Sequence, residues 1–124
     1  MKILALIFSL FVALEHLGFL YLEMFLWTKR PGRKIFGNSR EDAEKTKVLA
    51  ANQGLYNGFL AAGLIWGLVY PVAHVGYQIQ LFFLICVVIA GVYGGLTAKK
   101  TILLIQGLPA LIGAMLVAFL MASG

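Results

Sequence analysis

Three ionisable residues lie inside the first hydrophobic stretch of this sequence. Glu15, His16 and Glu23 interrupt residues 3–27, which are otherwise almost wholly apolar. A charge at the centre of a bilayer costs roughly 3 kcal/mol on insertion scales, so such residues usually face a protein interior or a wet cavity. A carboxylate beside an imidazole can relay protons, and either group can bind a metal ion. These three residues are therefore the first candidates for function.

The spacing of these residues along the helix bears on whether they form a proton relay or a metal site. His16 and Glu23 fall on nearly one stripe of a helix. Glu15 and His16 point to different sides, so we expect no metal site; they form a proton relay or are satisfied by another helix. The single cysteine, Cys86, lies in an apolar run and is predicted to be a buried thiol.

The composition indicates a chain embedded in lipid. Its 124 residues are 61% hydrophobic and 12% charged, with a mean hydropathy of +0.92. A membrane span needs about 20 apolar residues. Glu15 and His16 interrupt the first run, so we expect no cleavable signal peptide. We predict an all-α, integral membrane four-helix bundle that forms one domain over residues 1–124, with spans at residues 3–27, 47–69, 77–98 and 101–122.

Lysine and arginine are concentrated between the first and second predicted spans. Six of the ten fall there and a seventh, Lys47, is the first residue of the second span; Lys99 and Lys100 lie between the third and fourth spans. Because cytoplasmic loops are rich in these residues, we predict that both termini lie on the non-cytoplasmic side. The basic residues lack the interleaved aromatic residues of an RNA-binding surface. The net charge of +5 therefore indicates membrane topology, with the bilayer and not nucleic acid as partner.

The first connection carries local structural signals of its own. Ser39 and Asp42 have the spacing of a capping box, which predicts a helix that begins near Ser39 or Arg40. Pro31 and Gly32 are predicted to break the chain after the first helix. This leaves a short basic turn that could lie against anionic headgroups.

Polar residues fall at one depth in all four predicted spans. At about 1.5 Å of rise per residue, this layer lies roughly 8 Å beneath the inner surface. We predict a ligand-binding pocket at this level; the alternative is that these residues only hydrogen-bond between helices. Lys47, Lys99 and Lys100 lie nearby and would attract an anionic headgroup. The candidate ligand-binding residues are Glu23, Asn52, Gln53, Tyr93 and Gln106, with Tyr56 and Asn57 about one turn deeper.

Glycine spacing predicts close helix packing. A Gly-x-x-x-Gly pair lets two helices approach, although the partner helix can belong to the same chain or to another copy. Because four short spans enclose little volume, we expect a homo-oligomer with a cavity between subunits. Pro109 predicts a kink or break in the last span, opening space beside Gln106. The glycine pairs are Gly54 and Gly58, Gly63 and Gly67, and Gly91 and Gly95.

Two motifs carry a resemblance to a known family. The segments EHLGFLYLEMFLW, residues 15–27, and NQGLYNGFLAAGL, residues 52–64, resemble the bacterial membrane proteins known as domain of unknown function 1304. The resemblance covers nearly the whole chain. It implies a four-helix, multi-pass protein of the bacterial cell membrane with no settled activity.

The second motif carries a more distant resemblance. Asn52, followed by Tyr56 and then GFLAA, is similar to the second helix of the membrane-associated eicosanoid and glutathione (MAPEG) superfamily. That superfamily forms trimers of four-helix subunits. The resemblance implies that Asn52 and Tyr56 bind glutathione between subunits, with Tyr93 as a loose counterpart of the tyrosines in the third helix. Leu55 stands where the superfamily usually has an acidic residue.

Three classes of function follow from these patterns. A protein that binds a lipid-like or small anionic ligand needs the fewest assumptions and is our first prediction. The alternatives are a MAPEG-like glutathione-dependent transferase and a proton-coupled small transporter that uses Glu15, His16 and Glu23. The sequence assigns no catalytic residue, and glutathione is the one cofactor that the resemblance suggests.

Overall fold

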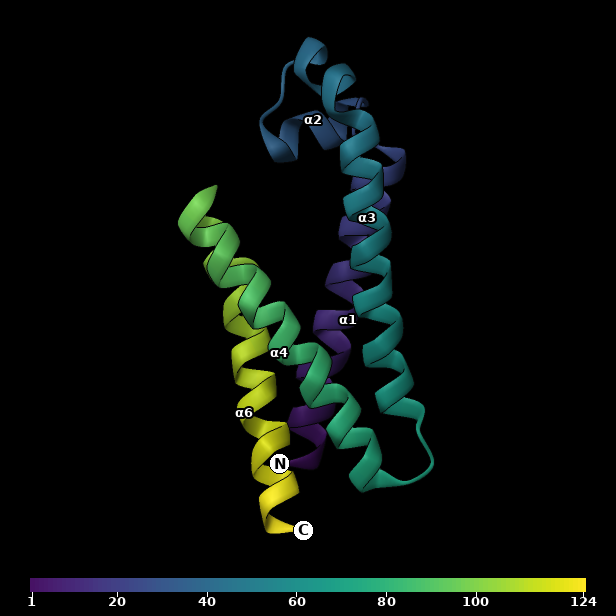
Figure 1. Ribbon diagram of the computed structural model, residues 1–124, viewed down its shortest axis with the longest axis vertical. Coiled ribbons are helices and arrows are strands. Elements are labelled where there is room, and N and C mark those ends of the chain that lie inside the picture. The colour runs from purple at the N-terminus through teal and green to yellow at the C-terminus, as the bar shows by residue number, and fades with distance from the viewer. The chain divides into compact units, whose positions relative to one another are not determined.

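The protein, described over all 124 residues by a computed structural model, contains helices and no strands. The predicted all-α fold class is therefore confirmed. The elements, labelled in Figure 1, are α1 (Lys2–Phe25), α2 (Arg30–Phe36), α3 (Arg40–Val69), α4 (Ala73–Thr97), α5 (Lys100–Ile102), the π-helical turn η1 (Leu103–Gly107) and α6 (Leu108–Ser123).

The chain divides into two compact units. The large unit consists of residues 1–14 and 60–124, and the small unit of residues 15–59. Both α1 and α3 contribute one part to each unit. The small unit therefore contains the second part of α1, all of α2 and the first part of α3.

Three helical stretches are long and apolar enough to cross a membrane, as expected for a membrane protein. They span 24 or 25 residues with a mean hydropathy of 2.2 to 2.3. Many large apolar side chains on these helices are exposed, including Ile3 at 76% and Leu96 at 81%. Helix α3 is not among the three, because its polar residues lower its hydropathy. The three stretches are Lys2–Phe25, Ala73–Thr97 and Lys100–Ser123.

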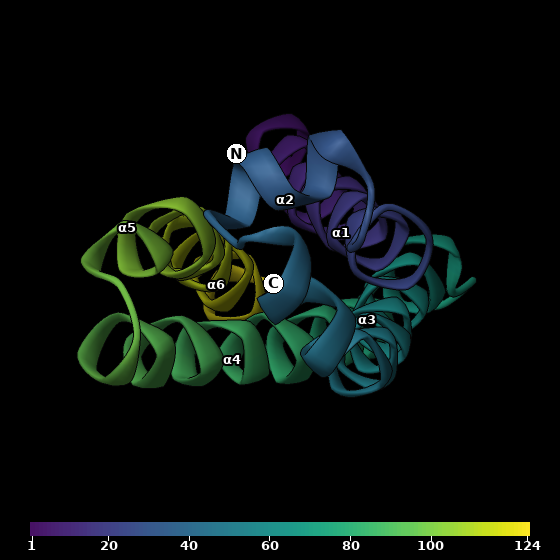
Figure 2. The same cartoon turned by 90° about the horizontal axis from the view of Figure 1, so that it is seen from above.

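The core of the large unit is built mainly from small and branched side chains. Helices α4 and α6 run side by side in Figure 1, and the end-on view in Figure 2 again places α4 beside α6. Small residues let helix backbones approach closely where lipid leaves no hydrophobic driving force between helices. The fully or nearly fully buried residues are Ala5, Val12, Ala13, Leu64, Leu84, Val87, Ala110, Ala114 and Val117.

The last span is disturbed next to Pro109, as the sequence predicts, but the helix does not break. The turn η1 precedes the proline, and the Leu108 N–H donates to the Leu103 carbonyl, five residues earlier. Proline has no N–H, and its ring would crowd the carbonyl of Ile105 in a regular α-helix. A π-helical turn accommodates both effects and keeps the helix continuous.

The glycine pairs find their partners within this chain. A Cβ atom built at Gly91 would lie 2.7 Å from the Cα atom of Gly107, and one at Gly67 would lie 2.7 Å from Cγ of Gln80. The open question from the sequence is thereby answered for these helix pairs. Close packing between α4 and η1, and between α3 and α4, requires glycine at these positions.

The connection between α1 and α3 differs in part from the expectation. Helix α3 begins at Arg40, as predicted, and the Asp42 N–H donates to Ser39 Oγ at 3.1 Å. The expected basic turn is instead the short helix α2, with Pro31 in its first turn. The fixed φ of proline suits the first helical turn. Helix α2 ends at Phe36, and Gly37, the next residue, adopts the left-handed conformation with φ 70°.

Candidate functional site

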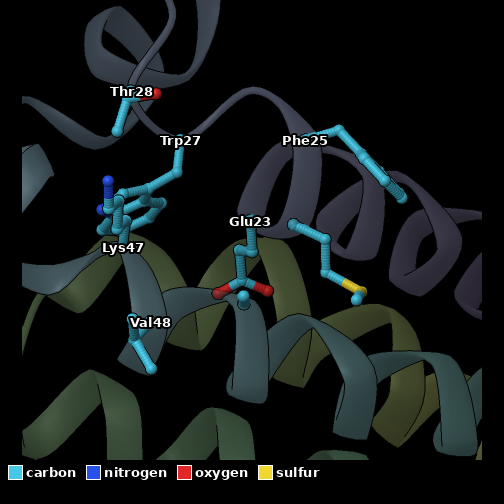
Figure 3. Close-up of a pocket in the computed structure, with 8 residues that line it drawn as sticks. Glu23, Phe25, Trp27, Thr28, Lys47 and Val48 are labelled. Atoms are coloured by element: carbon cyan, nitrogen blue, oxygen red, sulfur yellow. The ribbon is translucent and has the colours of Figure 1, made fainter.

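The candidate site is a pocket of about 340 Å³ in the small unit. The C-terminal end of α1 and the residues just after it form one wall, and the second to fourth turns of α3 form the other (Figure 3). Most of the lining side chains are apolar. The lining residues are Glu23, Met24, Phe25, Trp27, Thr28, Lys47, Val48 and Ala51.

The carboxylate of Glu23 lies at the floor of this pocket and is held by helix α3. Its side chain is 4% exposed and points toward α3 in Figure 3. Gln53 Nε2 donates to Glu23 Oε2 at 3.0 Å, and Asn57 Nδ2 donates to Glu23 Oε1 at 2.5 Å. A buried charge is costly without hydrogen bonds. Gln53 and Asn57, one turn apart on α3, supply them.

Glycine in α3 makes this contact possible. A Cβ atom at Gly54 would lie 2.9 Å from Met24 Cγ and 3.0 Å from Glu23 Cβ. One at Gly58 would lie 2.6 Å from Cδ1 of Leu20. The Gly-x-x-x-Gly pair therefore allows α3 to pack closely against α1. This close packing brings the two amides of α3 to Glu23.

The side chain of Trp27 is fixed at the other end of the pocket. Its Nε1 atom donates to Thr46 Oγ1 at 3.0 Å, and Thr46 Oγ1 donates to the Asp42 carbonyl at 2.8 Å. The indole ring also packs against Phe36 of α2, with ring centroids 4.8 Å apart. Helix α2 therefore helps to position a residue that lines the pocket.

Lys47 supplies the one cationic group of the pocket lining. Its Nζ atom lies 2.8 Å from Glu44 Oε2, and both side chains are about half exposed. The hydrogen bond and charge of Lys47 lower the pKa of Glu44 below its usual value. Exposed ion pairs of this kind contribute little to stability. Lys47 can therefore exchange its partner for an anion in the pocket.

The predicted polar residues of α3 lie on two different faces. Gln53 and Asn57 contact Glu23, whereas Asn52 and Tyr56 do not line the pocket. Tyr56 is 56% exposed, and its ring packs against Phe59, with centroids 5.7 Å apart. Of the predicted layer, the structure therefore brings together Glu23, Gln53 and Asn57.

The two remaining residues of the predicted layer belong to the large unit. Tyr93 is 70% exposed on α4. Gln106 is half-buried in the π-helical turn η1. A layer shared by all four predicted spans stays a prediction.

Glu15 and His16 lie deeper in α1. His16 is fully buried, and its ring contacts the edge of Phe19 with centroids 5.2 Å apart. His16 Nδ1 lies 4.0 Å from Glu15 Oε1, which is buried and makes no hydrogen bond. The structure contains no group of three or more His, Cys, Asp or Glu residues that could hold a metal ion.

A second buried polar network, in the large unit, is absent from the sequence analysis. Ser9 Oγ donates to Gln80 Oε1 at 2.8 Å, and Gln80 Nε2 donates to the Gly67 carbonyl at 3.3 Å. Ser9 and Gln80 are 0% and 5% exposed. The available signal was Gln80 itself, an uncharged amide directly before the apolar run of residues 81–92 in α4. The apolar lining of the small-unit pocket had no such signal.

Comparison with known proteins gives a family. The family model described as "Protein of unknown function (DUF1304)" matches residues 10–118. The chain is also 38% identical over 109 residues to "Uncharacterized protein YpaA" of Lactococcus lactis subsp. lactis (strain IL1403). That alignment covers 86% of this chain and 90% of that protein. No solved structure matches the chain. Because the family model covers most of the chain and the relative is similar over most of its length, this chain belongs to the DUF1304 family of proteins of unknown function.

Proposed function

We propose that this protein is a multi-pass protein of the bacterial cell membrane that binds a lipid-like or small anionic ligand. In this proposal α3 also crosses the membrane, in addition to the three long apolar stretches, and completes a single four-helix transmembrane domain. Its 30 residues extend about 45 Å, which exceeds the hydrocarbon core of a bilayer. The basic residues around α2 and at Lys99 and Lys100 support an orientation with both termini on the non-cytoplasmic side.

The small-unit pocket is the observation that carries the proposed binding function. It combines apolar side chains with one ammonium group, that of Lys47. A ligand with an apolar tail and an anionic headgroup matches both features, because the tail contacts Met24, Phe25 and Val48 while the headgroup pairs with Lys47. The Glu23 carboxylate, at the floor of the pocket, accepts hydrogen bonds from Gln53 and Asn57 of α3.

Tryptophan fluorescence provides a direct test of ligand binding. The chain has two tryptophans, and Trp66→Phe leaves Trp27, which lines the pocket, as the sole indole. In detergent solution, we expect Trp27 emission to change as dodecyl phosphate is added and to reach a plateau when the site is saturated. Dodecanol, which has the same chain without the charge, is expected to bind at least about tenfold more weakly, the loss of one charge-assisted contact.

A matched pair of lysine variants tests the role assigned to Lys47. Lys47→Gln is expected to weaken dodecyl phosphate binding about tenfold. Lys45→Gln is the control, because Lys45 is also exposed and paired with a glutamate, Glu41, but does not line the pocket. Equal binding by both variants, or equal binding of dodecanol, would show that no anion site exists at Lys47.

A second candidate, a MAPEG-like transferase, is favoured by the exposed face of α3. Asn52 and Tyr56 share that face and do not line the small-unit pocket, so a neighbouring subunit of a homo-oligomer could complete a glutathione site around them. Calorimetry with glutathione tests this candidate. Heat that saturates and disappears in Asn52→Ala supports it, and no heat at millimolar glutathione removes it.

A further inference from the structure

The large unit has a pocket of its own, separate from the proposed ligand site. It encloses about 240 Å³ between the first turns of α1, the end of α3 and the start of α4. Lys2, Tyr70, Tyr77 and Gln80 contribute its polar groups, and the remaining lining side chains are apolar or absent. All of the lining residues belong to the large unit.

A buried amide forms the inner end of this pocket. Gln80 is 5% exposed, and its amide is oriented by Ser9 on one side and by the Gly67 carbonyl on the other. These two bonds use the Gln80 oxygen and one N–H, so the second N–H of the amide is left as a donor. The amide is held in place before any ligand arrives, which lowers the entropic cost of binding.

The other polar groups of the pocket are donors without partners. Lys2 makes no ion pair, and the hydroxyl groups of Tyr70 and Tyr77 make no hydrogen bond within the chain. All five acidic residues of the sequence lie between positions 15 and 59, so the large unit contains no Asp or Glu side chain. The pocket therefore offers one ammonium group, two hydroxyls and one amide N–H, with no carboxylate to repel an anion.

We propose that this pocket is a second binding site and that it takes a phosphate oxyanion. Phosphate presents several strong acceptor oxygens and a negative charge, which match the donors of the pocket and the ammonium of Lys2. A phospholipid headgroup and a free phosphate share this chemistry. The apolar part of the lining favours a phosphate that carries an organic group.

Trp66 gives this pocket a fluorescence signal of its own. Its ring packs edge-on against Tyr70, with centroids 6.3 Å apart and an interplanar angle of 73°. Trp27→Phe leaves Trp66 as the only tryptophan. Because Trp27 reports on the small-unit pocket and Trp66 on this one, failure of either proposed site is seen independently of the other.

The experiment titrates Trp27→Phe with three probes in non-ionic detergent. The probes are dihexanoyl phosphatidic acid, inorganic phosphate and dihexanoylglycerol, which lacks the phosphate. We expect saturable binding of dihexanoyl phosphatidic acid. Binding of inorganic phosphate with equal affinity would assign the site to free phosphate, and weaker binding would assign it to a lipid headgroup; both results support the oxyanion site. Saturation by dihexanoylglycerol at the same concentration would overturn it.

Two conservative variants test the donors themselves. We expect Lys2→Gln to weaken binding of dihexanoyl phosphatidic acid about tenfold, and Tyr77→Phe to weaken it a few-fold, about the loss of one neutral hydrogen bond. Lys45→Gln, in the small unit, is expected to bind normally. Lys2 is exposed, so its replacement leaves the helix packing intact, which circular dichroism checks. Unchanged affinity in both Lys2→Gln and Tyr77→Phe would contradict the proposal.

Discussion

Asn57 Nδ2 of α3 donates a hydrogen bond of 2.5 Å to Glu23 Oε1 of α1. The acceptor is a nearly buried carboxylate and the donor is half-buried. Together with the bond from Gln53, this contact turns an ionisable residue in an apolar helix into a fixed part of the packing between α1 and α3. Glu23 is thus both the floor of the candidate pocket and a link between its two walls.

Replacement of Glu23 by leucine is expected to destabilise the protein. Glu23→Leu leaves the Asn57 amide without its acceptor, and a buried donor without a partner costs about 1–3 kcal/mol. The free energy of unfolding, measured by denaturant titration in detergent, checks this. The double variant Glu23→Leu/Asn57→Leu removes both polar groups and should recover part of the loss. Additive losses would contradict a direct bond between the two residues.

Replacement of Glu15 by leucine, unlike that of Glu23, is not expected to destabilise the protein. Its Oε1 atom is buried without a hydrogen bond, at 4.0 Å from the imidazole of His16. Glu15→Leu therefore removes a group that is not satisfied, and it should leave the free energy of unfolding unchanged or raise it. A loss as large as that of Glu23→Leu, measured in the same denaturant titration, would show that Glu15 has a stabilising partner.

Three glycines form a matched series for the packing of α1. Gly54→Ala should cost about 1–3 kcal/mol, because its Cβ would crowd Glu23 Cβ and the Leu20 carbonyl oxygen, at 3.0 and 3.3 Å. Gly58→Ala should cost less, since it meets only the flexible end of Leu20. Gly18→Ala meets nothing within 4 Å and should stabilise by up to about 1 kcal/mol. Thermal unfolding that ranks these variants in another order would contradict the close approach.

The Glu44 carboxylate is expected to limit anion binding at Lys47. Because Lys47 lowers the pKa of Glu44 below 4.5, the pair is intact at neutral pH and is lost only as the pH falls through that lowered value. Glu44→Gln should therefore raise the affinity for dodecyl phosphate a few-fold at pH 7. Titration of Trp27 emission with dodecyl phosphate at pH 7 checks this; an affinity unchanged by Glu44→Gln would show that Lys47 does not bind the headgroup.

Local signals in the sequence were sufficient to predict much of the secondary structure. The start of α3 follows from Ser39 and Asp42, because a helix cap depends on residues a few positions apart. The disturbance before Pro109 likewise follows from the chemistry of one residue, although the sequence predicts a kink or break and the structure has a π-helical turn.

The sequence predicts only part of the candidate site, because it does not fix how each helix is rotated about its axis. Residue depth along a helix predicts Glu23 and Gln53 at one level, but the rotation of each helix decides which polar residues meet. Gln53 and Asn57 therefore face Glu23, while Asn52 and Tyr56, on the neighbouring face, do not line the pocket. Apolar lining residues such as Val48 carry no distinguishing signal in an apolar sequence.

Photo-crosslinking in a membrane tests whether an amphiphilic anion binds in the small-unit pocket. A dodecyl phosphate analogue with a diazirine near its headgroup would be added to the protein in vesicles, irradiated, and located by mass spectrometry of peptides. We predict crosslinks concentrated at residues 24–28 and 47–51, reduced in Lys47→Gln and retained in Lys45→Gln. Crosslinks spread over the exposed apolar surface, such as Ile89 and Leu96, and equal in both variants, would contradict it.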